Sequence, residues 1–369
     1  MNRVRALRFQ IAAICFVMAA AQAQDNNATP AGSARPGDAI QNQPMAKSAK
    51  AGLVVHGGAG TIDRAKMTPE KEKAYRAGLE AALQAGWEIL QRGGSALDAT
   101  EASVHTLEDN PLFNAGRGAV FTSAGTNELD ASTMEGKTMR AGAVANVRHV
   151  KNPILLARKL LDSAERPAGS EPRSGPVLMV GDGAEAFAKE NGIELVDAKY
   201  FFTQERWDSL EKLKKAQAAG GHAAKQYIIS PDERHGTVGA VALDAGGTVA
   251  ASTSTGGMTN KPAGRLGDSP IIGAGTYANN ATCAVSCTGD GEYFIRAAVA
   301  HTVSDLMELR GMSVKEAAET ALQRAHNLGG EGGLIAIDRN GQYALPFNSN
   351  GMYRGYMDAN GKPVVEIYK

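Results

Sequence analysis

The residues best suited to chemistry gather in one stretch, residues 253–291. This stretch contains the run TSTGGMTNKPAGRLGDSPIIGAG and then CTGDG, in which glycines stand beside hydroxyl, arginine and aspartate side chains. Glycines in such a setting expose backbone N–H groups next to fixed charges. That combination suits a small zwitterionic ligand better than a macromolecule. The same composition is also typical of tight turns, so the pattern predicts a site without naming its reaction.

Other catalytic motifs are incomplete in this chain. Gly136–Thr138 resembles the end of a phosphate-binding loop, but the leading glycine of that motif falls on Ala131. The HGGAG run at 56–60 resembles an esterase oxyanion loop, yet the chain has no G-x-S-x-G. No CxxC or HExxH motif marks a zinc site. We expect Cys283 and Cys287 to be free, buried thiols, because four residues along a strand place them beyond disulfide reach.

The composition describes a globular protein without a charged partner surface. The 369 residues include 39 Lys+Arg and 39 Asp+Glu, so the formal net charge is zero. This balance argues against nucleic acid or an anionic membrane as a partner. Glycine is frequent, at 43 residues, and has no collagen period, which favours turns and close approach of backbone to a ligand.

The N-terminus has the layout of a secretory signal. MNRVRALR is basic, the following run FQIAAICFVMAAA is apolar, and Ala21–Ala23 forms an A-x-A cleavage site. The apolar run is shorter than a bilayer span, which disfavours the alternative of a retained membrane anchor. We therefore expect residues 1–23 to be a signal peptide and residues 24–50 to be a disordered leader. The mature protein is expected in the periplasm.

Local signals give helices first and hairpins later in the chain. Thr68-Pro69 and Ser95 mark two helix starts, and the double glycine 93–94 ends the first helix. The pattern then predicts a short strand, two hairpins and two more helices, at 53–55, 238–244 with 248–253, 334–338 with 342–347, 293–310 and 314–327. Hairpins with helix pairs favour an α+β fold of antiparallel sheets covered by helices.

Five motifs together resemble the plant-type (type 2) asparaginase/isoaspartyl peptidase family of N-terminal-nucleophile hydrolases. They are VVHGGAG at 54–60, PLFNAGRGAVFT at 111–122, HGTVGAVALD at 235–244, STSTGGMTNKPAGRLGDSP at 252–270 and AVSCTGDGE at 284–292. The resemblance covers residues 53–369 and implies a four-layer αββα sandwich with two stacked, mainly antiparallel sheets.

The resemblance also implies a self-cleaving precursor. Cleavage at Gly236–Thr237 would separate an α subunit, 51–236, from a β subunit, 237–369, both parts of one domain. The freed Thr237 amine would then serve as base for its own hydroxyl. Residues 203–236, charged and rich in Gly and Ala, are expected to be a solvated, mobile linker that lets the new end withdraw.

Further roles follow from matching the motifs. Thr255 would orient the Thr237 hydroxyl and help cleavage, and Asn114 would bond near the nucleophile. The resemblance gives the oxyanion hole to Thr288 and the Gly289 amide, the substrate α-carboxylate to Arg265, the substrate ammonium to Asp268 and a backbone contact to Gly291.

No catalytic metal and no required cofactor are implied. The family has a structural Na⁺ or K⁺ on backbone carbonyls, which would match Leu107, Glu108, Asn110, Phe113, Ala115 and Arg117. The resemblance also suggests a dimer of cleaved αβ units.

The expected activity is hydrolysis of β-aspartyl (isoaspartyl) dipeptides and deamidation of L-asparagine, because both substrates present the same aspartyl unit. One alternative is a glycosylasparaginase, which removes sugars from asparagine. That subfamily typically has Asp before the nucleophile, where this chain has Gly236. The other alternative is a binding homologue without catalysis, which the intact catalytic positions argue against.

Overall fold

A computed structural model describes residues 51–60, 62–163, 175–219 and 236–369. These residues belong to one compact unit, Ala46–Lys369. The expected signal peptide and leader at 1–50 lie outside the described residues, as do residues 220–235 of the expected linker.

Two β-sheets lie at the centre of this unit. The larger has eight strands in the order β12-β11-β1-β5-β6-β2-β3-β4, and the smaller has four in the order β10-β9-β8-β7. Neighbouring strands are antiparallel except for β3 and β4. The strands are β1 Gly52–Gly60, β2 Leu129–Glu135, β3 Ala141–Val147, β4 Leu178–Val180, β5 Val238–Leu243, β6 Val249–Thr255, β7 Thr276–Ala278, β8 Cys283–Gly289, β9 Gly332–Asp338, β10 Tyr343–Ala344, β11 Gly351–Met357 and β12 Pro363–Tyr368.

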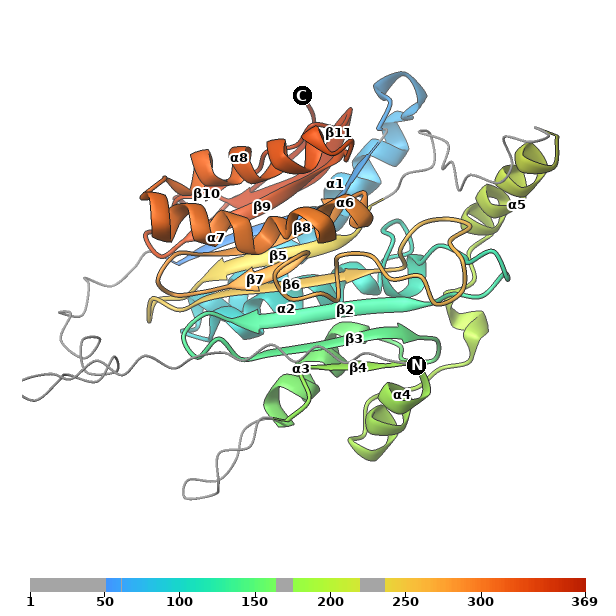
Figure 1. Cartoon of the computed structure of the whole chain (residues 1–369), viewed down its shortest axis with the longest axis horizontal. Coiled ribbons are helices and arrows are strands. Elements are labelled where there is room, and N and C mark those ends of the chain that lie inside the picture. Colours follow the sequence, from blue (N-terminus) through green and yellow to red (C-terminus); the bar gives the residue numbers. More distant parts are fainter. Residues whose placement is uncertain (1–50, 61, 164–174, 220–235) are drawn as a thin grey trace, which may run out of the picture. The chain divides into compact units, whose positions relative to one another are not determined.

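Helices cover the outer face of each sheet (Figure 1). Helices α1 to α4 pack on the larger sheet, and α6 to α8 pack on the smaller one. The expected four-layer αββα sandwich is therefore confirmed. The helices are α1 Pro69–Gln91, α2 Ala96–Glu108, α3 Pro153–Ser163, α4 Gly181–Glu190, α5 Gln204–Ala219, α6 Gly291–Ala297, α7 Val299–Arg310 and α8 Val314–Asn327.

Alternation along the central strands builds the two cores. In β1, Leu53 and Val55 pack in the cluster shared with α1 and α2, whereas Val54 packs in the cluster shared with β8 and β9. In β5, Ala240 and Val241 divide in the same way. Because successive side chains of a strand point to opposite faces, a strand buried on both faces must be apolar throughout. This explains the near-continuous apolar run after residue 237.

The predicted helix starts are confirmed. Thr68 accepts a hydrogen bond from the Lys71 amide at 3.2 Å, and Ser95 accepts one from the Asp98 amide at 3.1 Å. These side chains satisfy amides that have no partner inside their helices. The prediction of free, buried thiols is confirmed as well, because Cys283 and Cys287 are both unpaired and fully buried in β8.

The prediction of one helix over 293–310 is wrong. The chain breaks at Ala298, which has a left-handed backbone with φ of 47°, and α6 and α7 lie on either side of it. The loop before β7 competes for the amides at this point. The Ala300 amide donates to the Ala274 carbonyl at 3.1 Å, and the His301 amide donates to the Gly273 carbonyl at 2.8 Å. These long-range bonds are invisible to helical periodicity.

The expected solvated linker begins instead with a helix, α5. Its Leu210 and Leu213 are buried, and the buried Arg206 guanidinium donates to the carbonyls of Gly118 and Leu112, both at 3.0 Å. Neither the charge nor the small residues of this segment predicted the docking, because three buried side chains suffice to anchor it.

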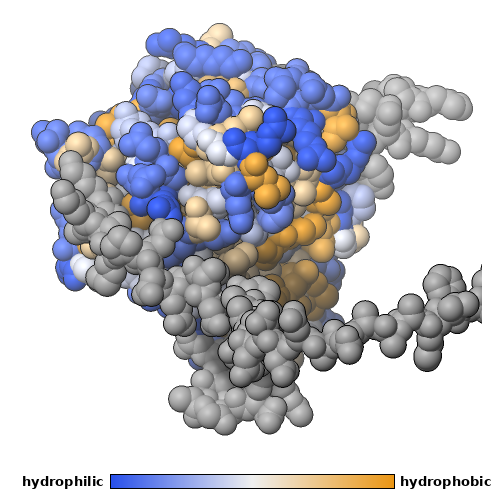
Figure 2. Space-filling model, turned by 60° about the vertical axis from the view of Figure 1, so that its left-hand side comes forward, coloured by the Kyte–Doolittle hydropathy of each residue, from blue (hydrophilic) through white to orange (hydrophobic). Residues whose placement is uncertain are grey.

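The surface is mostly polar. Figure 2 shows a largely hydrophilic face with a smaller apolar area. Exposed apolar side chains in the described part of the chain include Val177, Leu178 and Val180 around the edge strand β4. Among the described residues, no helix is both long enough and apolar enough to cross a bilayer.

Candidate active site

Thr237 stands at the head of β5, between the two sheets. Its side chain is nearly buried, with the residue 7% exposed. Its Oγ1 donates to Thr255 Oγ1 at 3.1 Å and lies 3.5 Å from Ser269 Oγ. The hydroxyl of the expected nucleophile therefore sits among other hydroxyls rather than beside an acid or base side chain, which fits a nucleophile that relies on its own amine.

The register of the β5–β6 pair places Thr255 beside Thr237. In the β5–β6 pair Val238 faces Ser254, so the residues just outside that pair, 237 and 255, meet at the same end. Thr255 Oγ1 also accepts from the Gly257 amide at 3.0 Å. Asn114 Nδ2 donates to the Gly257 carbonyl at 2.7 Å, which fastens the turn after Thr255.

The expected cleavage bond lies against β1 and β8. A side chain on Gly236 would stand 2.6 Å from the Ala59 amide nitrogen and 2.6 Å from Thr288 Oγ1, so only glycine fits there. Thr288 Oγ1 accepts from the Ala59 amide at 3.2 Å. Gly289 follows with φ of 155°, a conformation that favours glycine. Thr288, which is expected to take part in the oxyanion hole, thus lies beside Gly236, on the amino side of Thr237.

Arg265 lies at the edge of the site and is held by Glu292. Its Nε and Nη2 each donate to a different Glu292 carboxylate oxygen at 2.8 Å, in a bidentate pair. This pair fixes the plane of the guanidinium, and Nη1 lies beside Gly267. The arrangement suits recognition of a second carboxylate, because a planar guanidinium can donate hydrogen bonds to two partners at different edges.

Asp268 is a buried carboxylate with an unsatisfied oxygen. The residue is 3% exposed, and its Oδ2 has no hydrogen-bond partner among the described residues. Burial raises the pKa of Asp268 to about 7, against the smaller opposing effects of a backbone hydrogen bond and Arg265. Gly291 packs directly on this carboxylate. A buried acid without a partner is costly, so the site is suited to receiving a cation.

A buried lysine anchors the segment that carries Arg265. Lys261 is 2% exposed, donates to the Glu128 carbonyl at 2.9 Å and lies 3.8 Å from Asp130 Oδ2. The Glu128 carboxylate accepts from the Gly264 amide at 2.8 Å. Burial lowers the pKa of Lys261 and raises that of Asp130. The sequence analysis gave Lys261 no role, because a lysine in a polar run is usually a solvated one.

His56 is the functional candidate that sequence reasoning missed. Its Nδ1 lies 3.0 Å from the Thr237 carbonyl oxygen and its Nε2 lies 2.8 Å from Ser286 Oγ. Burial lowers the pKa of His56 to about 3, so the ring is neutral. The available signal was a histidine inside an apolar strand, directly before the glycines of VVHGGAG.

The loop expected to hold an alkali cation follows α2. The Phe113 amide donates to the Asn110 carbonyl at 3.2 Å, and Gly116 lies against the Glu108 carbonyl, so the two ends of this loop lie close together. Carbonyl oxygens are ligands that hard cations accept. The Glu108 side chain is fully buried and accepts from Ser254 Oγ at 2.6 Å, which ties this turn to β6. Binding of Na⁺ or K⁺ stays a prediction.

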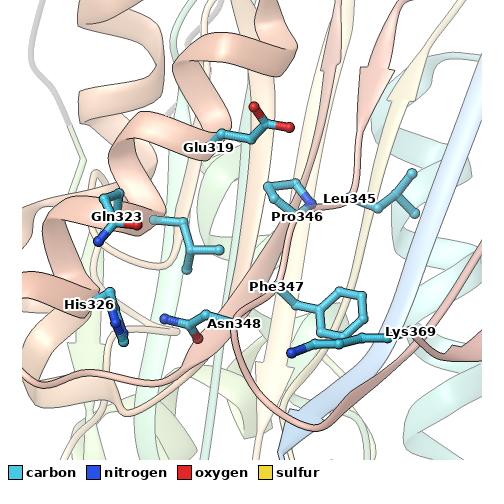
Figure 3. Close-up of a pocket in the computed structure, with 9 residues that line it drawn as sticks. Glu319, Gln323, His326, Leu345, Pro346, Phe347, Asn348 and Lys369 are labelled. Atoms are coloured by element: carbon cyan, nitrogen blue, oxygen red, sulfur yellow. The ribbon is translucent and has the colours of Figure 1, made fainter.

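Two surface pockets are lined by residues outside the candidate site. One, of about 460 Å³, lies between α8 and the segment around Phe347, and Figure 3 shows His326 and Lys369 among its lining residues. The other, of about 530 Å³, is walled by Phe121, Phe202 and Trp207. None of the candidate residues described above lines either pocket.

Comparisons with known proteins point to one family. A family model described as asparaginase matches residues 49–367. The chain is 48% identical to an isoaspartyl peptidase of Escherichia coli (strain K12), over 87% of this chain and 97% of the relative. It is 49% identical to the isoaspartyl peptidase of Salmonella typhimurium, over 87% and 99%. It is also 42% identical to a plant-type L-asparaginase of Pyrococcus abyssi, over 83% and 95%.

The unsatisfied carboxylate predicts a pH-dependent cost in stability. The folded pKa of Asp268, about 7, lies above its ordinary value of 3.8, so the folded state binds more protons between these values. The free energy of unfolding therefore falls as pH rises through this window. Asp268→Asn removes that effect and should exceed the wild type by about 1–2 kcal/mol at pH 5 and by about 4 kcal/mol at pH 8.

Urea unfolding at both pH values measures this difference. The exposed Asp182→Asn serves as the control, because it removes a carboxylate outside the candidate site. If the gain in unfolding free energy of Asp268→Asn stays constant from pH 5 to pH 8, the assignment of Asp268 as a buried acid without a partner is wrong.

Proposed function

Because the chain belongs to the asparaginase family, we propose that it is a self-activating threonine amidohydrolase. It hydrolyses β-aspartyl dipeptides and deamidates L-asparagine to aspartate and ammonia. The observation that carries the proposal is the Thr237 hydroxyl at the head of a buried strand, 3.1 Å from Thr255 Oγ1, with an unsatisfied carboxylate on the segment beside it.

Activation is an acyl shift followed by hydrolysis. The Thr237 hydroxyl attacks the Gly236 carbonyl carbon, the C–N bond breaks, and the nitrogen leaves as the Thr237 amine. Water then hydrolyses the resulting ester, which restores the hydroxyl and leaves a Gly236 carboxylate. The position of Thr288 supports this step, because a Cβ built on Gly236 would lie only 2.6 Å from Thr288 Oγ1, so a hydroxyl lies close to the residue that is attacked.

Turnover uses the same atoms on a free substrate. The Thr237 amine takes the hydroxyl proton as Oγ1 attacks the substrate β-carbonyl. Thr288 and the Gly289 amide stabilise the oxyanion, and the proton passes to the leaving amine or ammonia. Water hydrolyses the ester and releases aspartate. Arg265 and Asp268 would read the α-carboxylate and α-ammonium, which β-aspartyl dipeptides and asparagine share.

We also propose that the chain is exported. The support is the basic, apolar and A-x-A succession of the N-terminus. N-terminal sequencing of periplasmic material should find Gln24 as the first residue, and a retained Met1 would contradict this. The association of cleaved αβ units into a dimer stays a prediction.

The mass of the purified protein tests maturation. The purified wild type should separate into two fragments at Gly236–Thr237, the second being residues 237–369, whereas Thr237→Ala should remain one chain. Thr237→Ser should still cleave, more slowly, because it keeps the hydroxyl. Intact-mass measurement decides between these results, and an uncut wild type would sink the proposal.

The next prediction separates maturation from turnover. The internal Gly236–Thr237 bond has neither a free α-amine nor a free α-carboxylate, so cleavage should not need Asp268. Asp268→Ala should mature normally and lose kcat/KM by roughly thirty-fold to several thousand-fold, from about 2–5 kcal/mol for truncating one member of a buried charge pair. Arg265→Lys should also lower kcat/KM, since a lysine ammonium lacks the planar pair of donors of a guanidinium.

Kinetics with β-Asp-Leu and with asparagine, on cleaved protein, measure this loss. N-acetylated substrate should be poor with the wild type, because it lacks the cation that Asp268 pairs. Near-wild-type turnover by the cleaved Asp268→Ala protein would mean that the substrate lies elsewhere.

A further inference from the structure

We propose that His56 is a positioning residue for Thr237. Its neutral ring donates from Nδ1 to the Thr237 carbonyl oxygen and holds the backbone from which the reactive amine and hydroxyl both branch. The observation is the buried pair of contacts at 3.0 Å and 2.8 Å that this ring makes with Thr237 and Ser286. The inference rests on the proposed function and deepens it.

Strand pairing explains why a side chain is needed at this point. Pairing between β1 and β5 ends at His56 and Gly239, and the pairing of β1 with β11 shifts register between His56 and Gly58. The Thr237 carbonyl lies beyond the last pair on this side. The His56 ring reaches past the end of the ladder and supplies a donor to that carbonyl, as a backbone amide would in a continued strand.

The partners of the ring fix where its proton lies. A backbone carbonyl only accepts, so the Nδ1 that faces Thr237 must carry the hydrogen. The ring is neutral, since burial lowers its pKa to about 3, so Nε2 accepts from the Ser286 hydroxyl. Ser286 Oγ lies 2.7 Å from Thr253 Oγ1, which accepts from Thr276 Oγ1 at 2.6 Å. The Thr237 carbonyl therefore fixes the tautomer, and the hydroxyls, which can donate or accept, adjust to it.

A glycine provides the space for the ring. A side chain on Gly239 would collide with His56 Nε2 and with Ser286 Oγ. The ring thus lies over the backbone of β5, two residues after Thr237. This contact explains why the run HGTVGAVALD has a glycine inside a buried strand, where glycine is otherwise unfavourable.

The function of the contact follows from the geometry of a chain end. After cleavage nothing precedes Thr237, so its Cα is held only through its own peptide plane. Because Cα lies in that plane, a hydrogen bond that fixes the carbonyl also fixes Cα. The bond from Oγ1 to Thr255 then limits the remaining rotation about Cα–C. In the precursor the peptide bond to Gly236 also holds the amino side of Thr237. Turnover should therefore depend on His56 more than maturation does.

Two substitutions separate the donor from the volume of the ring. In His56→Asn the amide nitrogen replaces Nδ1 and keeps a donor for Thr237, whereas in His56→Gln the amide replaces Nε2 and keeps only the contact with Ser286. His56→Gln should lower kcat by roughly 10-fold to 100-fold with KM little changed, since a misplacement near 1 Å costs about 100-fold. His56→Asn should retain most of kcat.

Ser286→Ala adds a test of the tautomer and should lower kcat less than His56→Gln does. Ser304→Ala is its control, because Ser304 is equally buried and bonds Thr282 Oγ1 at 2.6 Å in place of any site residue. Kinetics with β-Asp-Leu on cleaved proteins give these values. Wild-type kcat in both His56 variants, or equal losses in both, would overturn the proposal.

Nitrogen-15 NMR of the histidine-labelled wild type tests the same point without a variant in the measured protein. His56, assigned by its absence in His56→Gln, should show a protonated Nδ1 and an unprotonated Nε2 from pH 5.5 to 8.5. A proton on Nε2 would overturn the proposal. An inactive, uncleaved wild type would instead refute the proposed function, so the two failures are distinguishable.

Discussion

Polar groups buried between two apolar sheets must find partners inside the protein, and this constraint governs the structure around Thr237. An unpaired buried donor or acceptor costs about 1–3 kcal/mol. The hydroxyls of Thr253, Thr276 and Ser286 accordingly form a continuous series that ends on His56. The Thr237 hydroxyl has polar neighbours in the core, because the surrounding strands present small hydroxyl side chains where apolar ones would otherwise pack.

Asp268 departs from this rule, and it lies in the part of the site that we propose binds the α-ammonium of the substrate. Its Oδ2 is buried without a partner, while Arg265 is already fixed by Glu292. One unsatisfied acid near one oriented guanidinium suits a zwitterion better than an apolar ligand.

The sheet order explains how one chain could be divided at Gly236 and remain one fold. Strand β5, which begins at Val238, lies between β1 and β6, and β2 follows on the other side of β6. Strands from before and after Gly236 therefore alternate in the larger sheet, joined by ladder hydrogen bonds rather than by the peptide bond at 236. Both apolar cores likewise include residues from both sides of that bond.

The sequence alone determined the helix starts, the β5–β6 hairpin and the family motifs, because capping, turn chemistry and contiguous motifs are local. It also placed Thr237, Thr255 and Asp268 on one predicted site. Tertiary structure alone decided the break at Ala298, the docking of α5 through Arg206 and the position of His56, since each depends on partners far away in the chain. His56 and Thr237 lie 181 residues apart, and only the pairing of β1 with β5 brings them together.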